Sequence, residues 1–152
     1  MQASYMKRCL ELAQVAFSRG EVPVGAVVVY QNQIIAEGWN CRETLQSSIR
    51  HAEIIAIEKA CEALHAWRLL DCQLYVTLEP CIMCAGAILQ SRIPSVSFAA
   101  LDPKGGACGS LFSLHNDPRL NHQFSLEQDL EHMDASRQLL QSFFQSRRRP
   151  SA

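Results

Sequence analysis

The spacing of apolar residues divides the first forty positions into one helix and one pair of strands. Four apolar residues recur at helical spacing: Met6, Leu10, Ala13 and Phe17. Gly20 follows them and predicts the end of this helix. Two apolar, β-branched runs at 24–30 and 34–39 then flank the polar residues 31–33. This pattern predicts a β-hairpin with a three-residue loop.

The remaining pattern alternates helices with strands. It first predicts a helix that begins near His51 and reaches Leu64, followed by a buried strand at 74–78. A second helix is predicted from Pro80, in its first turn, to about Arg92. A strand at 96–99 and a last helix from about Leu126 to Arg147 follow. Residues 101–109 include three glycines and a proline and predict a loop. The sequence therefore predicts a mixed sheet with helices on both faces.

Composition indicates one folded domain. The chain has 152 residues, of which 48% are hydrophobic and 19% charged, so we expect residues 1–152 to form a single globular domain that folds alone. A net charge of −1 excludes a strongly basic nucleic-acid binder. The last helix and a short basic tail, at about 126–152, differ from this average: residues 135–152 carry four Arg and no acidic residue. Any contact with a polyanion is thus predicted near Arg147–Arg149.

Cysteine usage and hydropathy bear on location. The seven cysteines are odd in number and lack the spacing of a disulfide-stapled secreted domain, so we expect reduced thiols. The first residues do not read as a signal peptide, and no apolar run approaches the length of a membrane span. These features predict a cytoplasmic protein with no membrane contact and with thiols available for a metal or for catalysis.

The strongest chemical signal combines two short motifs at predicted helix starts. One is His51-Ala52-Glu53, and the other is Pro80-Cys81-Ile82-Met83-Cys84. Cys81 and Cys84 are three residues apart, so they share a helix face and can bind one metal ion. With His51 they supply three ligands, and tetrahedral Zn²⁺ then keeps its fourth position for water or substrate. An open position is typical of catalytic zinc.

Glu53 is the candidate general acid and base. It lies too close in sequence to His51 to ligate the same ion easily, but it can reach a water on that ion. Taken alone, each motif has an ordinary explanation. A C-x-x-C pair is often half of a structural zinc site or a redox pair, and a single His on a helix is usually packed in a core.

Together the two motifs form the H-x-E and P-C-x-x-C combination of the zinc-dependent nucleobase deaminases. The sequence resembles one group of these, the tRNA-specific adenosine deaminases, over nearly its whole length. The segments that carry the resemblance are Glu21–Ala26, Gly38–Asn40, Leu74–Cys81, Cys84–Ala87, Asp102–Ala107, Gly109–Leu111, Asn121-His122 and Phe143-Phe144. Two segments depart from the pattern, Ser47–Arg50 and Ala99–Leu101.

The resemblance implies a cytidine-deaminase-like fold, with three α/β/α layers and a mixed central sheet of about five strands. It implies one Zn²⁺ per subunit on His51, Cys81 and Cys84. Glu53 would pass a proton from the zinc-bound water to the adenine ring and later to the leaving ammonia, while hydroxide attacks C6. The reaction would convert adenosine to inosine at the wobble position of an anticodon. Asn40 matches a position that hydrogen-bonds the flipped nucleoside.

The resemblance also implies a tRNA anticodon stem-loop as partner and a homodimer as the working form. Asp102 matches a position that contacts the ribose beside the target nucleoside. A carboxylate that accepts a hydrogen bond from the 2′-hydroxyl there would favour RNA, because DNA has no such donor. Lys104 is a further candidate RNA contact, and Arg147 and Arg148 are candidates to bind phosphate. For the arginine run, a solvated basic tail is the alternative.

Three other functions remain open. A deaminase of free cytosine, guanine or a nucleoside would share the zinc chemistry, although a small substrate would not require the 102–106 loop or the basic tail. A structural zinc or RNA-binding module, which is not an enzyme, would need a fourth protein ligand, and none is evident in the sequence. A redox pair would need no His51. The sequence assigns no role to Arg50, Cys41 or Cys108.

Overall fold

A five-stranded mixed sheet organises the molecule, and its strands lie in the order β2-β1-β3-β4-β5. The computed structural model describes residues 3–147. The strands are β1 (Gly25–Tyr30), β2 (Gln33–Trp39), β3 (Cys72–Leu78), β4 (Ser95–Ala100) and β5 (Ser125–Gln128). β1 pairs antiparallel with β2 and with β3, whereas β3, β4 and β5 run parallel. The predicted mixed sheet is confirmed.

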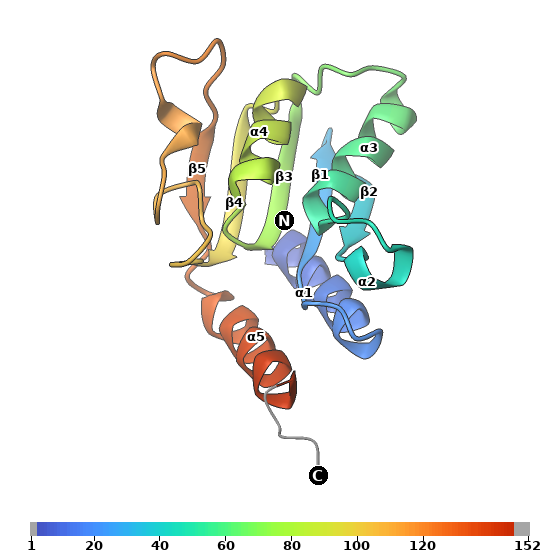
Figure 1. Cartoon of the computed structure of the whole chain (residues 1–152). Coiled ribbons are helices and arrows are strands. Elements are labelled where there is room, and N and C mark those ends of the chain that lie inside the picture. The colour runs from blue at the N-terminus through green and yellow to red at the C-terminus, as the bar shows by residue number, and fades with distance from the viewer. Residues whose placement is uncertain (1–2, 148–152) are drawn as a thin grey trace.

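Helices cover both faces of this sheet, as predicted (Figure 1). The helices are α1 (Ala3–Ser18), α2 (Arg42–Leu45), α3 (Ala52–Leu64), α4 (Ile82–Ser91) and α5 (Met133–Arg147), with a short 3-10 turn at Leu114–Asn116. α3 and α4 lie side by side on one face, and α1 and α5 lie on the other. This arrangement gives the three α/β/α layers expected from the resemblance.

The core is divided by the sheet into two apolar clusters. Alternate residues of β1 supply both, because neighbouring side chains of a strand point to opposite faces. Ala26 and Val28 pack in the larger cluster with α3 and α4, while Val27 and Val29 pack with α1 in the smaller one. Helix α1 comes so close to Gly25 that a Cβ atom added there would lie 2.1 Å from the backbone oxygen of Cys9. β1 is therefore an interior strand of the sheet, buried from Gly25 to Val29.

Two local predictions need correction. The hairpin loop has two residues, not three, and both Gln31 and Asn32 adopt positive φ, +52° and +61°. Such a turn matches the twist of the flanking strands. Pro80 lies before helix α4, not in its first turn, because Cys81 is the N-cap residue and the helix begins at Ile82.

The start of the C-terminal helix was also predicted wrongly. Residues 125–128 form β5, which pairs with β4, and the helix begins only at Met133. Pairing with an existing sheet edge here outweighs the helical spacing of the apolar residues. The Asp129 carboxylate accepts hydrogen bonds from the backbone N–H and the ring of His132 and so marks the helix start. Within residues 3–147, no helix is long and apolar enough to cross a membrane.

Candidate active site

Two helix N-termini bring the predicted metal ligands together. His51 is the N-cap residue of α3, and Cys81 is the N-cap residue of α4, each with extended backbone geometry. Since α3 and α4 lie side by side over the sheet, these two starts face each other. Cys84 is in the first turn of α4, so its side chain returns to the same point.

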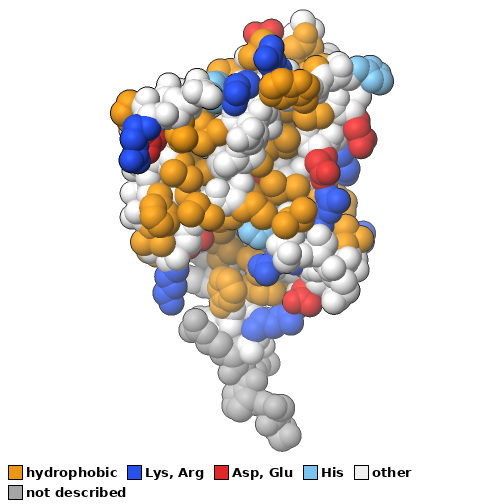
Figure 2. Space-filling view, turned by 45° about the horizontal axis from the view of Figure 1, so that its top comes forward, with side chains coloured by type: hydrophobic (Ala, Val, Ile, Leu, Met, Phe, Trp, Pro, Cys, Tyr) orange, Lys and Arg blue, Asp and Glu red, His pale blue; other side chains and the backbone are white. Residues whose placement is uncertain are grey.

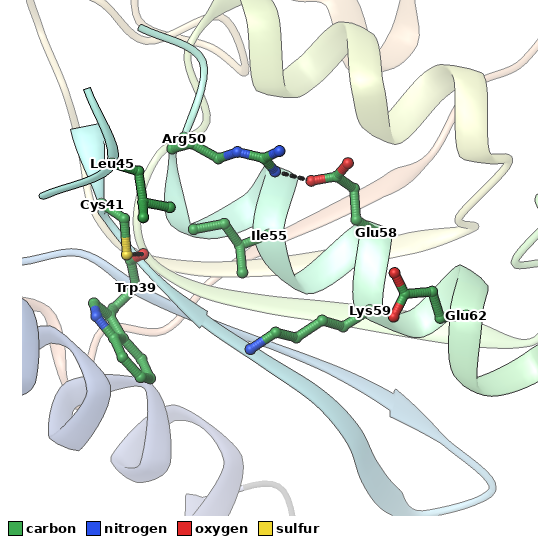
Figure 3. Close-up of a pocket in the computed structure, with 8 residues that line it drawn as sticks. All are labelled: Trp39, Cys41, Leu45, Arg50, Ile55, Glu58, Lys59 and Glu62. Carbon is green, nitrogen blue, oxygen red and sulfur yellow. Dashed lines mark hydrogen bonds and ion pairs between the residues drawn. The ribbon is translucent and has the colours of Figure 1, made fainter. Parts of the chain in front are cut away.

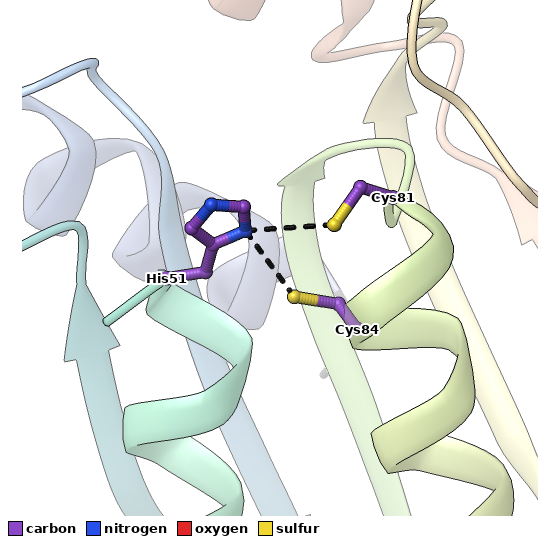
Figure 4. Close-up of side chains that lie close together, drawn as sticks. All are labelled: His51, Cys81 and Cys84. Carbon is purple, nitrogen blue, oxygen red and sulfur yellow. Dashed lines mark hydrogen bonds between the residues drawn. The ribbon is translucent and has the colours of Figure 1, made fainter. Parts of the chain in front are cut away.

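The distances among the three side chains fit a tetrahedral zinc ion. The His51 Nδ1 atom lies 3.5 Å from the Cys81 sulfur and 3.5 Å from the Cys84 sulfur (Figure 4). Tetrahedral zinc with ordinary bond lengths separates a nitrogen and a sulfur ligand by about 3.6 Å. All three donor atoms lie within 4.8 Å of one another. The predicted ligand set is therefore a preformed group of the right chemistry and spacing.

The local electrostatics favour a thiolate in this group. A hydrogen bond from the Cys84 thiol, opposed by burial and assisted by His51, lowers the pKa of Cys81 to about 4. The thiolate is the form of cysteine that binds metals. The residue is thus ready to bind a metal ion at neutral pH.

Glu53 lies beside the ligands without belonging to them. It is in the first turn of α3 and is 4% exposed. Burial raises the pKa of its carboxyl group to about 7. A carboxyl group with a pKa near neutrality can both accept and donate a proton, as a general acid and base must. The geometry is compatible with the predicted role.

A small cavity joins these groups to candidate recognition residues. It has a volume of about 140 Å³, and its walls are formed by Val22, Val24, Asn40, Arg42, His51, Glu53, Leu78, Glu79, Cys81 and Asp102. The fold therefore brings Glu53 and two of the predicted ligands, His51 and Cys81, to one cavity with Asn40 and Asp102. These residues come from four separate segments of the sequence. Lys104, in contrast, is exposed and does not line this cavity.

Asn40 connects the cavity to the helix that carries His51 and Glu53. Its Oδ1 atom accepts a hydrogen bond of 2.8 Å from the backbone N–H of Ala52, the first residue of α3. The first N–H groups of a helix have no partner inside the helix, so this bond satisfies one of them. It also fixes the amide with its NH₂ group as the remaining donor.

Comparisons with known proteins agree on one family. A family model described as MafB19-like deaminase matches residues 1–148. A tRNA-specific adenosine deaminase of Bacillus subtilis is 54% identical over 119 residues, which cover 78% of this chain and 74% of the relative. The chain belongs to the tRNA-specific adenosine deaminases. It is thus a deaminase, as predicted from the two motifs.

Solved structures place the chain in the same family and show its wider relationships. A structure from a study of A-to-I editing by tRNA:A34 deaminases matches with a TM-score of 0.87 and 40% identity, over 91% of this chain and 99% of that one. A guanine deaminase from Nitrosomonas europaea matches with a TM-score of 0.74 and 27% identity, over 91% and 82%. The cytidine-deaminase-like fold is confirmed, and it is shared with deaminases of a different named substrate.

Two buried carboxylates hold the cavity walls of this tRNA-specific adenosine deaminase, and neither was predicted from the sequence. Glu79 accepts hydrogen bonds from the backbone N–H groups of Asp102, Cys108 and Ser110. Glu79 was visible only as part of the resembling segment, without a role. Its position between an apolar strand and a proline was the one available signal.

Glu21 is the second of these carboxylates, and it holds the opposite wall. It is 2% exposed and accepts hydrogen bonds from the N–H groups of Glu43 and Thr44 and from the Thr44 hydroxyl, at 3.1, 2.6 and 2.6 Å. These bonds fix the one-turn helix α2, which carries Arg42 into the cavity wall. The apolar pattern of the sequence predicted no helix between the hairpin and His51.

Of the two arginines expected to bind phosphate, only Arg147 lies within the described residues. The Arg147 guanidinium donates to the Gly20 carbonyl and lies 4.8 Å from the Phe143 ring. It lines a hollow of about 290 Å³ that also includes Asn40 and Arg42, beside the small cavity. Arg148 lies outside the described residues.

Arg50 and Cys41 lie at a separate surface groove of about 410 Å³ (Figure 3). There Arg50 pairs with Glu58, and Cys41 donates weakly to the Trp39 carbonyl. None of the three predicted metal ligands lines this groove, nor does Glu53. Cys108 is a buried thiol whose backbone N–H binds Glu79. The structure therefore gives Arg50, Cys41 and Cys108 local structural contacts.

Proposed function

We propose that this chain hydrolyses adenosine to inosine at the wobble position of a tRNA anticodon, with one zinc ion bound by His51, Cys81 and Cys84. The observation that carries the proposal is the three-donor group with a buried Glu53 beside it, in a chain of this family. The named relatives and the structural neighbour support tRNA as the substrate class. All seven cysteines are free, which supports a reducing cytoplasm as the place of action.

When bound, zinc supplies Lewis acidity that makes a water molecule acidic enough to react near neutral pH. Glu53 then manages the protons. Its carboxylate takes one proton from the attacking water and delivers it to the ring nitrogen next to C6. A second transfer gives a proton to the departing amino group, so that adenosine and water yield inosine and ammonia. Burial of Glu53 keeps bulk water away from these transfers.

The cavity dimensions support a substrate that enters one base at a time. A volume of about 140 Å³ is of the order of one nucleobase and excludes a base pair. A base must therefore leave its stack to enter, and this costs least in a single-stranded loop. The free NH₂ group of Asn40 donates to an acceptor of the nucleoside. Asp102, at the cavity edge, accepts from a ribose hydroxyl.

Basic residues around the cavity support an RNA ligand. Arg42 lines both the cavity and the adjoining hollow, and Arg147 lines that hollow. Lys104 is exposed on the loop that follows Asp102. These residues, with Arg148, are our candidates for phosphate contact. Because Arg147 already binds Gly20 and stacks on Phe143, it contributes from a fixed position and not as part of a free tail.

We also propose that two copies assemble into a homodimer. Hydrophobic side chains gather on the face that α3 and α4 cover (Figure 2). Three exposed apolar residues, Ile82, Leu111 and Phe112, are linked through Gly106. Gly106 bridges to Cys81, the neighbour of Ile82, and its carbonyl accepts from the N–H groups of Leu111 and Phe112. Exposed apolar clusters of this kind mark protein interfaces. Sedimentation that gives only monomer at micromolar concentration would contradict this assembly.

A deaminase of free guanine is the second candidate, because a named guanine deaminase shares the fold. One experiment separates the two. Zinc-loaded protein is incubated with an anticodon stem-loop that bears a wobble adenosine, with its DNA counterpart, with free adenosine and with guanine, and the products are quantified by mass spectrometry. The Glu53→Gln variant is the control for background deamination.

We expect inosine from the RNA hairpin, with the other three substrates far slower. Deamination of guanine or free adenosine at the rate of the hairpin or faster would contradict the tRNA assignment and retain the zinc chemistry. Failure of all four substrates with zinc bound would contradict the whole proposal.

A further inference from the structure

A buried carboxylate lies at the end of the strand that leads to the metal ligands. Glu79 follows β3 and precedes Pro80 and Cys81. It is 1% exposed, yet it is neither a member of the three-donor group nor paired with a basic side chain among the described residues. A buried carboxylate is costly unless hydrogen bonds compensate it. Its partners therefore indicate what it does.

Every compensating bond comes from one loop. The Oε1 atom accepts from the N–H of Asp102 at 3.1 Å and from the Ser110 hydroxyl. The Oε2 atom accepts from the N–H groups of Cys108 and Ser110, both at 3.0 Å. An ionised carboxylate only accepts hydrogen bonds, so it is matched to four donors. Both ends of the 102–110 loop thus converge on a single side chain.

The loop is also shaped around this carboxylate. A Cβ atom at Gly106 would lie 2.3 Å from the Glu79 carboxyl carbon, so no larger residue fits there without a shift. On the same turn, the N–H of Ala107 donates to the Pro80 carbonyl at 2.9 Å, and Gly106 bridges to Cys81. The loop is therefore fastened to the chain segment that positions a zinc ligand.

Asp102 is the residue that this arrangement places. Its backbone N–H is held by Glu79, and its Oδ1 atom accepts from the N–H groups of Lys104 and Gly105 at 3.2 and 3.1 Å. One carboxylate oxygen is thus occupied by the turn. The other, Oδ2, has no hydrogen-bond partner among residues 3–147, and Asp102 lines the cavity.

We propose that Glu79 is a positioning residue for the substrate: it holds the 102–110 loop so that Asp102 is presented at the cavity edge, and it thereby sets the affinity for RNA. This inference rests on the proposed function. It separates Glu79 from Glu53, although both are buried carboxylates near the same cavity. Glu53 moves protons, whereas Glu79 acts only through the loop.

The test replaces Glu79 with Gln, which keeps the shape but turns one acceptor into a donor facing N–H groups. We expect KM for the RNA hairpin to rise about tenfold, which is the effect of losing one to two net hydrogen bonds. We expect kcat to stay within about threefold of the wild-type value. A threefold change corresponds to less than half the free energy of a tenfold change. Zinc content should remain that of the wild type. Hydrogen exchange at the amides of Cys108 and Ser110 should become faster.

Two further variants keep the test decisive. Glu127→Gln makes the same chemical change at an exposed residue of β5 and should alter none of the four readouts. Ser110→Ala removes one hydroxyl donor to Glu79 but leaves its three backbone N–H donors in place, so we expect it to fold even if Glu79→Gln does not. We expect it to raise KM in the same direction by about threefold, roughly the effect of half a net hydrogen bond.

An unchanged KM in folded Glu79→Gln, or in Ser110→Ala if Glu79→Gln does not fold, would overturn the inference. Loss of zinc, or a fall in kcat with KM unchanged, would also overturn it, because Glu79 would then support the metal site. Wild-type protein that shows slow exchange at these amides but no activity on RNA would contradict the proposed function instead. The exchange rates test the fastening of the loop without any substrate.

Discussion

The cavity has two sides that are built in different ways. On the proposed metal side, His51, Cys81 and Cys84 are held by the first residues of two helices packed on the sheet. On the proposed recognition side, α2 and the 102–110 loop carry Arg42 and Asp102. These segments have little regular structure of their own. Their backbone N–H groups instead donate to buried carboxylates. Those of α2 donate to Glu21, and those of the 102–110 loop donate to Glu79.

The difference gives a physical reason why one fold could keep its chemistry while its substrate changes. The solved structures similar to this chain include a tRNA deaminase and a guanine deaminase, with 40% and 27% identity to it. A helix start depends on the sheet and the core, which many residues maintain together. A loop fastened to one carboxylate depends on a few hydrogen bonds. Changes on the recognition side should therefore affect substrate binding first, and changes on the metal side should affect turnover.

The largest effect is expected from loss of a metal ligand. Cys84→Ser should abolish stoichiometric zinc binding and reduce deamination to background, because two protein ligands rarely retain catalytic zinc. Removal of zinc from the wild type with a chelator should do the same, and added zinc should restore activity. Metal analysis and initial rates measure both. Cys61→Ser, a free cysteine on the same face of the sheet, is the control and should keep zinc and activity.

The next effect concerns turnover alone. Glu53→Gln should lower kcat by roughly 10²-fold to 10⁴-fold, the usual contribution of general acid–base catalysis, while zinc content and affinity for the hairpin stay near those of the wild type. Single-turnover rates, metal analysis and equilibrium binding check these three quantities. The control is Glu62→Gln, an exposed residue on the same helix. Zinc loss in Glu53→Gln would mean that Glu53 belongs to the ligand set.

These two sides were not equally accessible from the sequence. The convergence of His51, Cys81 and Cys84 could be predicted because these residue types are chemically distinctive and closely spaced, and because apolar periodicity locates the two helices near whose starts they lie. The mixed sheet and both helix layers followed from the same periodicity. One element that was predicted wrongly, residues 125–128, has an apolar pattern compatible with a helix, and only the edge of β4 makes it a strand.

The recognition side could not be predicted in the same way. Glu21 and Glu79 are common residue types without a spacing rule, and their partners lie 22 to 31 residues away. Only the folded chain shows that each is buried and surrounded by N–H donors. Likewise, the sequence indicated a role for Arg147 from its charge, but not its bond to Gly20.

A smaller effect should appear at Asn40, where the two sides meet. Asn40→Asp keeps an oxygen that accepts the Ala52 N–H but removes the NH₂ donor to the nucleoside. We expect kcat/KM for the hairpin to fall roughly 10-fold to 100-fold, with zinc content and Tm close to the wild type. Asn40→Ala removes both functions and should also cost about 1 kcal/mol of stability, as loss of a helix cap does. Equal Tm values for the two variants would contradict the capping role.

The smallest effect, and the most specific for the recognition side, is expected from Glu21→Gln, and it depends on pH. Burial alone would raise the pKa of Glu21, but hydrogen bonds from Thr44 and Glu43 outweigh it and hold the pKa below its ordinary value. A group whose pKa is lower in the folded state stabilises the protein above the unfolded-state pKa, about 4.3 for Glu. That stabilisation is lost as the pH falls through the folded-state pKa.

The difference in Tm between wild type and Glu21→Gln should therefore be largest near pH 7 and shrink steadily below about pH 4.5, where the unfolded chain begins to bind the proton. Thermal unfolding followed by circular dichroism between pH 7 and pH 3 measures this. Glu127→Gln, at an exposed position, provides the comparison curve. If the Tm difference for Glu21→Gln does not depend on pH, the ionised carboxylate is not what holds α2. The loss of one hydrogen-bond acceptor, and not the loss of a charge, would then explain the difference in Tm.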